Sequence, residues 1–217
     1  MKSLIESGAI YELIKKELQN LPGDAAHLEM IPYRTKESLL KQPNQPAKQS
    51  AVLCLLTTSD SHLNITLMER TKDGSPHSGQ ISFPGGKMEQ TDPHLSHTAL
   101  RETYEEIGIK PTKIELLGRL TSLYIPVSNF EVTPFIGFTH KADDFVLSKR
   151  EVKSVFNISL DDLVHPANKT KRDIPNHLGQ TLKNIPCFYI NNKIIWGATA
   201  LVLNEVRTIW STIQSKI

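Results

Sequence analysis

The sequence has few of the residues that build disulfide frameworks or membrane spans. Only two cysteines occur in 217 residues, and Cys54 and Cys187 both stand inside apolar stretches far from each other. We therefore expect buried thiols in a reducing compartment and no metal site made of sulfur ligands. No apolar run is long enough to cross a bilayer, and the N-terminus lacks the apolar centre of a signal peptide. These absences predict a cytoplasmic protein with no membrane partner.

Neither sign of charge is in large excess. Lys and Arg number 25 against 23 for Asp and Glu, which gives a formal net charge of +2, and no long basic run occurs. The electrostatic footprint of a nucleic-acid-binding protein is missing, so we expect no nucleic-acid partner. With 39% hydrophobic and 22% charged residues, the chain has the composition of a globular protein with a core of its own.

Proline and glycine divide the chain into an extension and a main domain. Apolar residues at helical spacing predict an amphipathic helix over residues 3–19, which Leu21-Pro22-Gly23 breaks. Residues 42–48 contain two prolines and no apolar periodicity, as expected of a linker. The predicted parts are an N-terminal helical extension and linker (residues 1–45), a main domain (residues 46–190) and a closing C-terminal helix (residues 191–217).

Short apolar runs separated by polar turns predict strands. Residues 51–56 and 65–68 flank the polar turn 58–61, which is typical of a hairpin at the start of the main domain. Further strands are expected at residues 80–83, 114–120, 132–138, 156–158 and 187–190.

One helix is expected in the middle of the domain and another at its end. Asp92 is a good N-cap residue, Pro93 suits the first helical position and Gly108 is a stop. Residues 197–214 have the pattern of an amphipathic closing helix. Strands before and after a central helix predict fold class α/β (α+β), with a mixed sheet.

The central helix separates packing residues from acidic ones. At 3.6 residues per turn, Glu102, Glu105 and Glu106 share one arc. Like charges at this spacing cost about 0.2–0.5 kcal/mol per pair, so a cation should offset them, and carboxylate oxygens suit Mg²⁺ or Mn²⁺. Taken alone, three glutamates are more often a solvated helix face. The opposite, packing face is expected to hold Ala99, Leu100, Thr103, Tyr104 and Ile107.

The segment from Gly86 to Ile109 resembles the Nudix box, Gly-x5-Glu-x7-Arg-Glu-U-x-Glu-Glu-x-Gly-U, in which U is apolar. Its second half, Arg101-Glu-Thr-Tyr-Glu-Glu-Ile-Gly-Ile109, matches nearly letter for letter. Asp92 stands where the box has Glu, and one extra residue lies between it and Arg101. The resemblance implies the Nudix fold, a mixed β-sheet sandwiched between helices, and hydrolysis of a diphosphate by a metal-activated water.

The resemblance also assigns roles to the box residues. Glu102 and Glu106 would be the principal metal ligands, and Glu105 a further ligand or an outer-shell partner. The general base would be Glu102 or Glu151, although an exposed loop residue is the more ordinary interpretation of Glu151. Arg101 lies beside the acidic arc and could fix Glu105 or another box carboxylate. The alternative for Arg101 is a surface residue.

Upstream of the box, residues 67–71 (Leu-Met-Glu-Arg-Thr) and 77–86 (His-Ser-Gly-Gln-Ile-Ser-Phe-Pro-Gly-Gly) resemble the signature of the coenzyme A diphosphatase branch of Nudix enzymes. Residues 128–135 and 195–200 also look like branch features, while Gly74 replaces a usual Leu. The branch implies cleavage of coenzyme A, or of an acyl or oxidised form, to 4′-phosphopantetheine and adenosine 3′,5′-bisphosphate.

A substrate of this kind calls for cations and for close backbone approach. Arg70, Lys72 and Lys87 could bind phosphate or could be solvated surface residues, and His77 could touch a phosphate or simply be held by hydrogen bonds. Glycine lets the turn before the helix approach a phosphate. The predicted substrate-binding residues are Arg70, His77, Gln80, Gly85, Gly86 and Lys87.

Two other functions stay open. A Nudix enzyme for ADP-ribose, NADH or another nucleoside diphosphate derivative would share every box residue. A non-catalytic nucleotide-binding Nudix-like module is the alternative of another class, against which the intact glutamates weigh. Residues 21–27 could dock on the core or on a second subunit, so a homodimer is also open.

Overall fold

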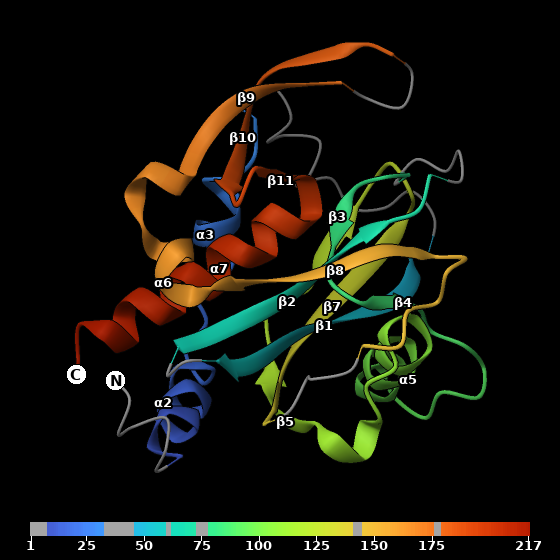
Figure 1. Ribbon diagram of the computed structural model, residues 1–217, viewed down its shortest axis with the longest axis vertical. Coiled ribbons are helices and arrows are strands. Elements are labelled where there is room, and N and C mark those ends of the chain that lie inside the picture. The colour runs from blue at the N-terminus through green and yellow to red at the C-terminus, as the bar shows by residue number, and fades with distance from the viewer. Residues whose placement is uncertain (1–7, 33–45, 60–61, 73–77, 141–144, 176–178) are drawn as a thin grey trace.

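The computed structural model describes residues 8–32, 46–59, 62–72, 78–140, 145–175 and 179–217. In these residues a mixed sheet of eight strands forms the centre of the molecule (Figure 1). The predicted hairpin forms from β1 (Lys48–Ser59) and β2 (His62–Arg70). Strand β1 also pairs in parallel with β7 (Phe130–Thr139) and antiparallel with β4 (Gly85–Lys87). Apolar β1 is therefore the central strand on which the sheet is built.

The other strands of this sheet extend it on both sides of β1. Its main path runs β3-β2-β1-β7-β5, with β6 paired to β7 and β8 paired to β2. The predicted strands all form, and β4 and β6 are two short ones that the apolar pattern does not reveal. The bounds are β3 (Ile81–Ser82), β5 (Glu115–Arg119), β6 (Leu123–Ile125) and β8 (Val152–Ser159).

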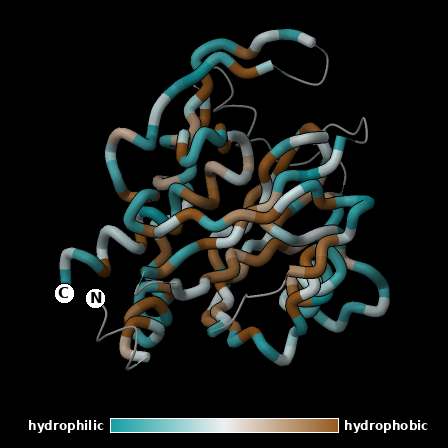
Figure 2. The backbone as a smooth tube through the Cα atoms, viewed as in Figure 1, coloured by the Kyte–Doolittle hydropathy of each residue, from teal (hydrophilic) through white to brown (hydrophobic). Residues whose placement is uncertain are grey.

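Helices cover both faces of the sheet, as predicted for a sheet sandwiched between helices (Figure 1). Helix α5 (Leu95–Ile107) packs on one face through a smaller apolar cluster. Helices α7 (Gly197–Gln214) and α2 (Ala9–Glu17) pack on the other through a larger one. In Figure 2 the hydrophobic stretches run through the central strands and α7. The remaining helices are α3 (Asp24–Leu28), α6 (Leu160–Val164), η2 (Pro111–Lys113) and η3 (Pro166–Asn168).

A second, three-stranded antiparallel sheet lies before α7. It orders β11-β10-β9, with β9 (Lys169–Pro175), β10 (Thr181–Ile190) and β11 (Lys193–Trp196). Only the end of β10 is expected from the sequence. Strand β9 is largely hydrophilic (Figure 2) and has no apolar alternation, so pairing with β10 decides its conformation.

The N-terminal extension is joined to the core by a buried polar cluster. Glu205 of α7 is fully buried and accepts hydrogen bonds from the amide of Gly23 at 3.3 Å and from the Oγ1 of Thr121 at 2.6 Å. Its Oε2 lies 3.2 Å from Nε2 of His27. One carboxylate therefore connects α3, the end of β5 and α7.

Cys54 and Cys187 are both buried free thiols. Within the described residues no helix is both long and apolar enough to cross a membrane.

Candidate active site

The loop before α5 differs from the predicted helix start. Asp92 is expected to cap the helix and Pro93 to open it, but α5 begins at Leu95. The N-cap is His94, whose Nδ1 accepts a hydrogen bond from the amide of His97 at 3.1 Å. The prediction is wrong because other donors occupy the carboxylate of Asp92.

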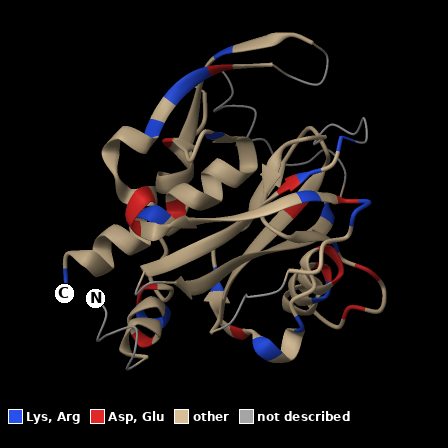
Figure 3. Ribbon diagram, in the orientation of Figure 1, with Lys and Arg blue, Asp and Glu red and all other residues tan. Residues whose placement is uncertain are grey.

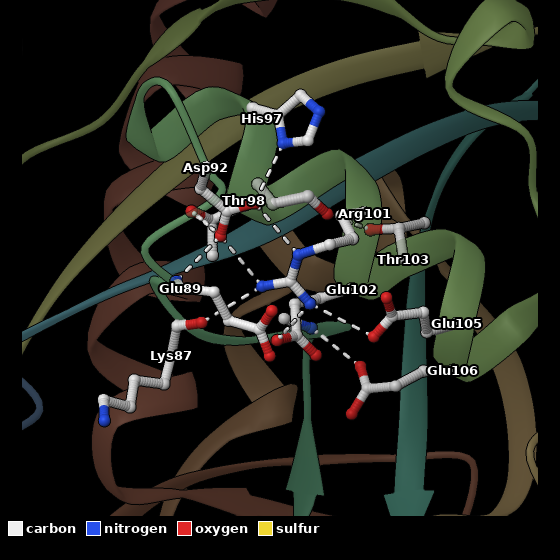
Figure 4. A network of polar contacts seen from close by, with 12 residues as sticks. Lys87, Glu89, Asp92, His97, Thr98, Arg101, Glu102, Thr103, Glu105 and Glu106 are labelled. Carbon is white, nitrogen blue, oxygen red and sulfur yellow. Dashed lines mark hydrogen bonds and ion pairs between the residues drawn. The ribbon is translucent and has the colours of Figure 1, made fainter.

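Asp92 has a fully buried carboxylate surrounded by donors (Figure 4). Arg101 donates to it from Nε at 3.0 Å and from Nη2 at 2.9 Å. The Oγ1 of Thr98 donates at 2.9 Å and the amide of Glu89 at 3.0 Å, while Nδ1 of His97 lies at 2.9 Å. Arg101, more than any other donor, holds the pKa of Asp92 well below its usual range. Asp92 therefore anchors Arg101, and its oxygens are not left for a metal.

Arg101 connects this anchor to the acidic side of α5. Its Nη1 donates to Glu102 at 3.0 Å and to Glu105 at 3.1 Å, and its Nη2 donates to the carbonyl of Lys87 at 3.1 Å (Figure 4). Asp92 raises the pKa of Arg101 above its ordinary value, so the guanidinium stays charged. The contact between Arg101 and Glu105 is confirmed, and the alternative of a free surface arginine is wrong.

Two positions on α5 reverse the helical-wheel prediction. Tyr104, expected on the packing face, is 48% exposed, whereas Glu106, expected on the acidic arc opposite that face, is 2% exposed. Ala99, Thr103 and Ile107 are buried as predicted. The buried face therefore extends from these residues to the side of Glu106, because this carboxylate reaches back to the turn at β4.

The buried carboxylate of Glu106 is held by a backbone amide and a guanidinium. Its Oε2 accepts a hydrogen bond from the amide of Gly85 at 2.8 Å, and its Oε1 lies 3.5 Å from Nη1 of Arg70. Burial raises the pKa of Glu106 to about 8; Gly85 and Arg70 oppose this effect, and Glu102 and Glu151 reinforce it. A carboxylate in this environment favours a cation close by.

Gly85 and Gly86, at the start of the box, are closely approached by other groups. A Cβ at Gly85, whose φ is +149°, would lie 2.3 Å from the carbonyl oxygen of Ala51. A Cβ at Gly86 would lie 2.5 Å from the Cδ of Glu102. The carboxylate of Glu102 therefore packs directly on the glycine backbone, and burial raises its pKa. The turn and the acidic helix face meet without intervening side chains.

Glu151 reaches the same carboxylates from a distant part of the chain. The amide of Ser148 donates to the carbonyl of Glu106 at 2.9 Å, and the amide of Thr71 donates to the carbonyl of Glu151 at 3.0 Å. The negative charge of Glu151 contributes to raising the pKa of both Glu102 and Glu106. Glu151 is half-buried, and its charge acts on the carboxylates of Glu102 and Glu106.

The carboxylates have the chemistry of a site for a hard cation but face other partners. Across the described ranges, no three acidic, histidine or cysteine side chains converge on one point. Glu102 and Glu105 turn toward Arg101, and Glu106 turns toward Arg70. Acidic residues nevertheless gather on α5 and on the loop before it (Figure 3). This all-oxygen donor set fits Mg²⁺ or Mn²⁺.

The predicted substrate-binding residues differ in their placement. Arg70 is half-buried and bound to an acidic group, so it is not a free surface cation. Lys72 and Lys87 are exposed. The carbonyl of Gln80 accepts a hydrogen bond from the amide of Arg70 at 3.0 Å. His77 lies outside the described residues.

The sequence profile described as the NUDIX domain matches residues 47–178. This chain belongs to the Nudix family. Among the curated relatives of this Nudix hydrolase is Nudix hydrolase 3 of Caenorhabditis elegans, 29% identical over 197 residues, with 84% of this chain and 81% of that protein covered. A Nudix hydrolase NudL of Pectobacterium atrosepticum is 30% identical over 165 residues, with 76% and 84% covered.

Solved structures show the same fold at low sequence identity. A C. elegans Ap4A hydrolase complex aligns with a TM-score of 0.52 and 14% identity, covering 78% of this chain and 99% of that one. The Nudix hydrolase RenU of M. smegmatis aligns with a TM-score of 0.53 and 14% identity, covering 77% and 88%. The protein is a Nudix diphosphatase that acts on a nucleoside diphosphate derivative. Nudix enzymes typically use a divalent metal.

Two contributors to the site were missed in the sequence. Thr98 and His97 hold Asp92, and neither stands out in the box pattern. The ion pair between Arg70 and Glu106 was also missed, because the two residues lie far apart in sequence. For the cluster around Asp92, the available sequence signal was the box itself, which places an acidic residue before the arginine.

Proposed function

We propose that this Nudix hydrolase cleaves the diphosphate of coenzyme A, or of an acyl or oxidised derivative. The products would be 4′-phosphopantetheine and adenosine 3′,5′-bisphosphate. The observation that supports this substrate is the contact between two segments that both resemble the coenzyme A diphosphatase branch. The Oγ1 of Thr199 at the start of α7 donates to the carbonyl of Ile81 in β3 at 2.9 Å. Strand β3 leads directly into the turn at Gly85 and Gly86, so the C-terminal segment supports the catalytic turn.

Glu102, Glu105 and Glu106 would hold Mg²⁺ or Mn²⁺. The metal would lower the pKa of the nucleophilic water and neutralise negative charge on the diphosphate. The amide of Gly85 keeps Glu106 in place at 2.8 Å. Asp92 keeps Arg101 charged and pointed at the other two glutamates. The residues of the box thus fix one another before substrate arrives.

Glu151 is the general base in this proposal. Its charge acts on both Glu102 and Glu106, and it comes from a loop whose backbone is bonded to the end of α5. A general base must lie within hydrogen-bond reach of the water that it deprotonates. Glu102 is bonded to Arg101 and would serve as a metal ligand. Exposed Lys87 would meet the substrate phosphates at the rim of the site.

Incubation of the protein with coenzyme A, acetyl-coenzyme A, ADP-ribose and NADH, each with Mg²⁺ or Mn²⁺, tests the substrate. Product masses identify the bond that is cleaved. We expect the highest kcat/KM for a coenzyme A compound. Higher kcat/KM for ADP-ribose or NADH would reject the substrate while leaving the diphosphatase activity in place.

A substitution of Glu151 tests its role as the general base without changing the proposed metal ligands. Glu151→Gln should lower kcat by roughly 10²- to 10⁴-fold, the range typical of general base catalysis, with little change in KM. Lys153→Gln, a short way along the chain and exposed, is the matched control. An unchanged kcat in Glu151→Gln would assign the base to another group.

A further inference from the structure

The ion pair between Arg70 and Glu106 has no role in the reaction described so far. Arg70 is the last residue of β2, and its amide is fixed by the carbonyl of Gln80 at 3.0 Å. Its Nη1 lies 3.5 Å from Oε1 of Glu106, which is longer than a good hydrogen bond and marks an electrostatic contact. The arginine side chain is 27% exposed, whereas that of Glu106 is 2% exposed. One partner is therefore fixed in the interior and the other reaches solvent.

The three glutamates of α5, Glu102, Glu105 and Glu106, are each matched by an arginine. Arg101 is saturated by Asp92, Glu102 and Glu105, and its Nε, Nη1 and Nη2 all donate. Among the described residues, Arg70 makes the looser contact, at 3.5 Å from the carboxylate of Glu106. Of the two guanidinium groups, Arg70 is thus the one whose contact is more readily exchanged for a metal ion.

We propose that Arg70 is a built-in counter-ion, which pairs with Glu106 in the metal-free enzyme and gives way to the divalent metal. This inference rests on the proposed metal-dependent function. The carboxylates are turned toward arginines, and within the described part of the chain no three of the potential ligands converge. Metal binding therefore requires Glu106 to exchange one cation for another, after which the guanidinium of Arg70 faces the site with an unpaired charge. A diphosphate is the anion that such a group binds well.

The exchange makes Arg70 a competitor of the metal. Removal of a unit positive charge a few ångströms from a divalent ion is worth a factor of roughly ten in affinity, even when the effective dielectric constant is high. The same removal leaves Glu106 buried without its cation in the metal-free protein, which destabilises the fold. Metal affinity and metal-free stability should therefore change in opposite directions.

The test uses Mn²⁺ alone as the probe, titrated without substrate into the full chain and followed by the electron paramagnetic resonance signal of free Mn²⁺. Arg70→Met keeps the apolar stem and removes the charge. We expect it to bind Mn²⁺ about tenfold more tightly, and to melt at a lower temperature than wild type in EDTA but not in saturating Mn²⁺. Arg119→Met, which removes an exposed arginine at the end of β5, should change neither quantity.

Arg70→Lys provides a second variant if Arg70→Met does not fold, and its Mn²⁺ affinity should stay near that of wild type. Weaker or unchanged Mn²⁺ binding by Arg70→Met would overturn the proposal. Because these measurements contain no substrate, they are independent of whether coenzyme A is the compound cleaved. With the substrate that is cleaved, Arg70→Met should raise KM more than it lowers kcat.

Discussion

The guanidinium of Arg101 donates to the carboxylate of Asp92 from both Nε and Nη2, at 3.0 and 2.9 Å. This bidentate pair ties the loop before α5 to the middle of the helix, and its remaining nitrogen points at the glutamates. The loop that carries the extra residue of the box is thus tied to α5 by this side-chain pair, in addition to the helix cap at His94. The orientation of the acidic face thus depends on a residue that is not expected to touch substrate.

Asp92→Asn should disturb this orientation. The side-chain amide of the variant could accept from only one nitrogen of the guanidinium and would leave the charge of Arg101 without its partner. We expect a loss of about 2–4 kcal/mol in the free energy of unfolding and a fall of at least tenfold in kcat. Urea unfolding and steady-state kinetics measure the two. Asp173→Asn removes the carboxylate of an exposed pair with Lys183 and should change each by little.

Glu106→Gln tests the buried carboxylate. The amide oxygen can still accept the hydrogen bond from Gly85, so the fold should persist while the charge is lost. We expect kcat to fall by more than the roughly 10–100-fold typical of outer-shell losses. The kcat of Glu105→Gln should fall less, because the side chain of Glu105 is 53% exposed. Near-normal turnover of Glu106→Gln would contradict its assignment as a metal ligand.

Gly86→Ala tests the close approach of the turn and the helix. The added Cβ would lie 2.5 Å from the Cδ of Glu102, so the carboxylate must move. We expect at least roughly a tenfold fall in kcat and a reduction in Mn²⁺ affinity, measured by kinetics and titration. The control is Gly179→Asn, in an open turn at φ +73°, a conformation that Asn tolerates. Equal effects in the two variants would show a general cost of losing glycine.

Glu205 should make stability depend on pH. Burial alone would raise the pKa of Glu205, but the hydrogen bonds from His27 and Thr121 outweigh burial, so the pKa lies below its ordinary value of 4.5. A depressed folded-state pKa contributes stability that is fully present above the unfolded-state pKa. That stability is lost as pH falls through the folded-state value.

Glu205→Gln should therefore lose about 2–4 kcal/mol at pH 7 and show a shallower loss of stability below pH 4.5 than wild type. Thermal unfolding followed by circular dichroism between pH 3 and pH 7 measures both. Parallel curves for the two proteins would show that Glu205 does not titrate differently in the folded state. Activity at pH 7 and 25 °C should be retained, since the cluster lies at α3 and α7, away from the box helix.

Local patterns in the sequence were sufficient for the apolar strands and the closing helix. Their residues recur with the period of a strand or a helix, and burial of one face then determines the element. Gly108 was also correctly predicted as the end of α5, because its φ of +80° is one that glycine adopts without strain. Strand β9 could not be predicted, since its pattern is polar and its pairing with β10 supplies the stabilisation.

For the site, the sequence by itself determined which residue types are present: glutamates at i, i+3 and i+4, an arginine beside them, and glycines in the turn before. These follow from spacing along one chain segment. Only the tertiary structure decided that Glu106 is buried while Tyr104 is exposed, that Asp92 anchors Arg101, and that Arg70 and Glu151 reach the same carboxylates. Each of these depends on which face of α5 meets the sheet and on contacts between distant segments, and helical periodicity contains neither.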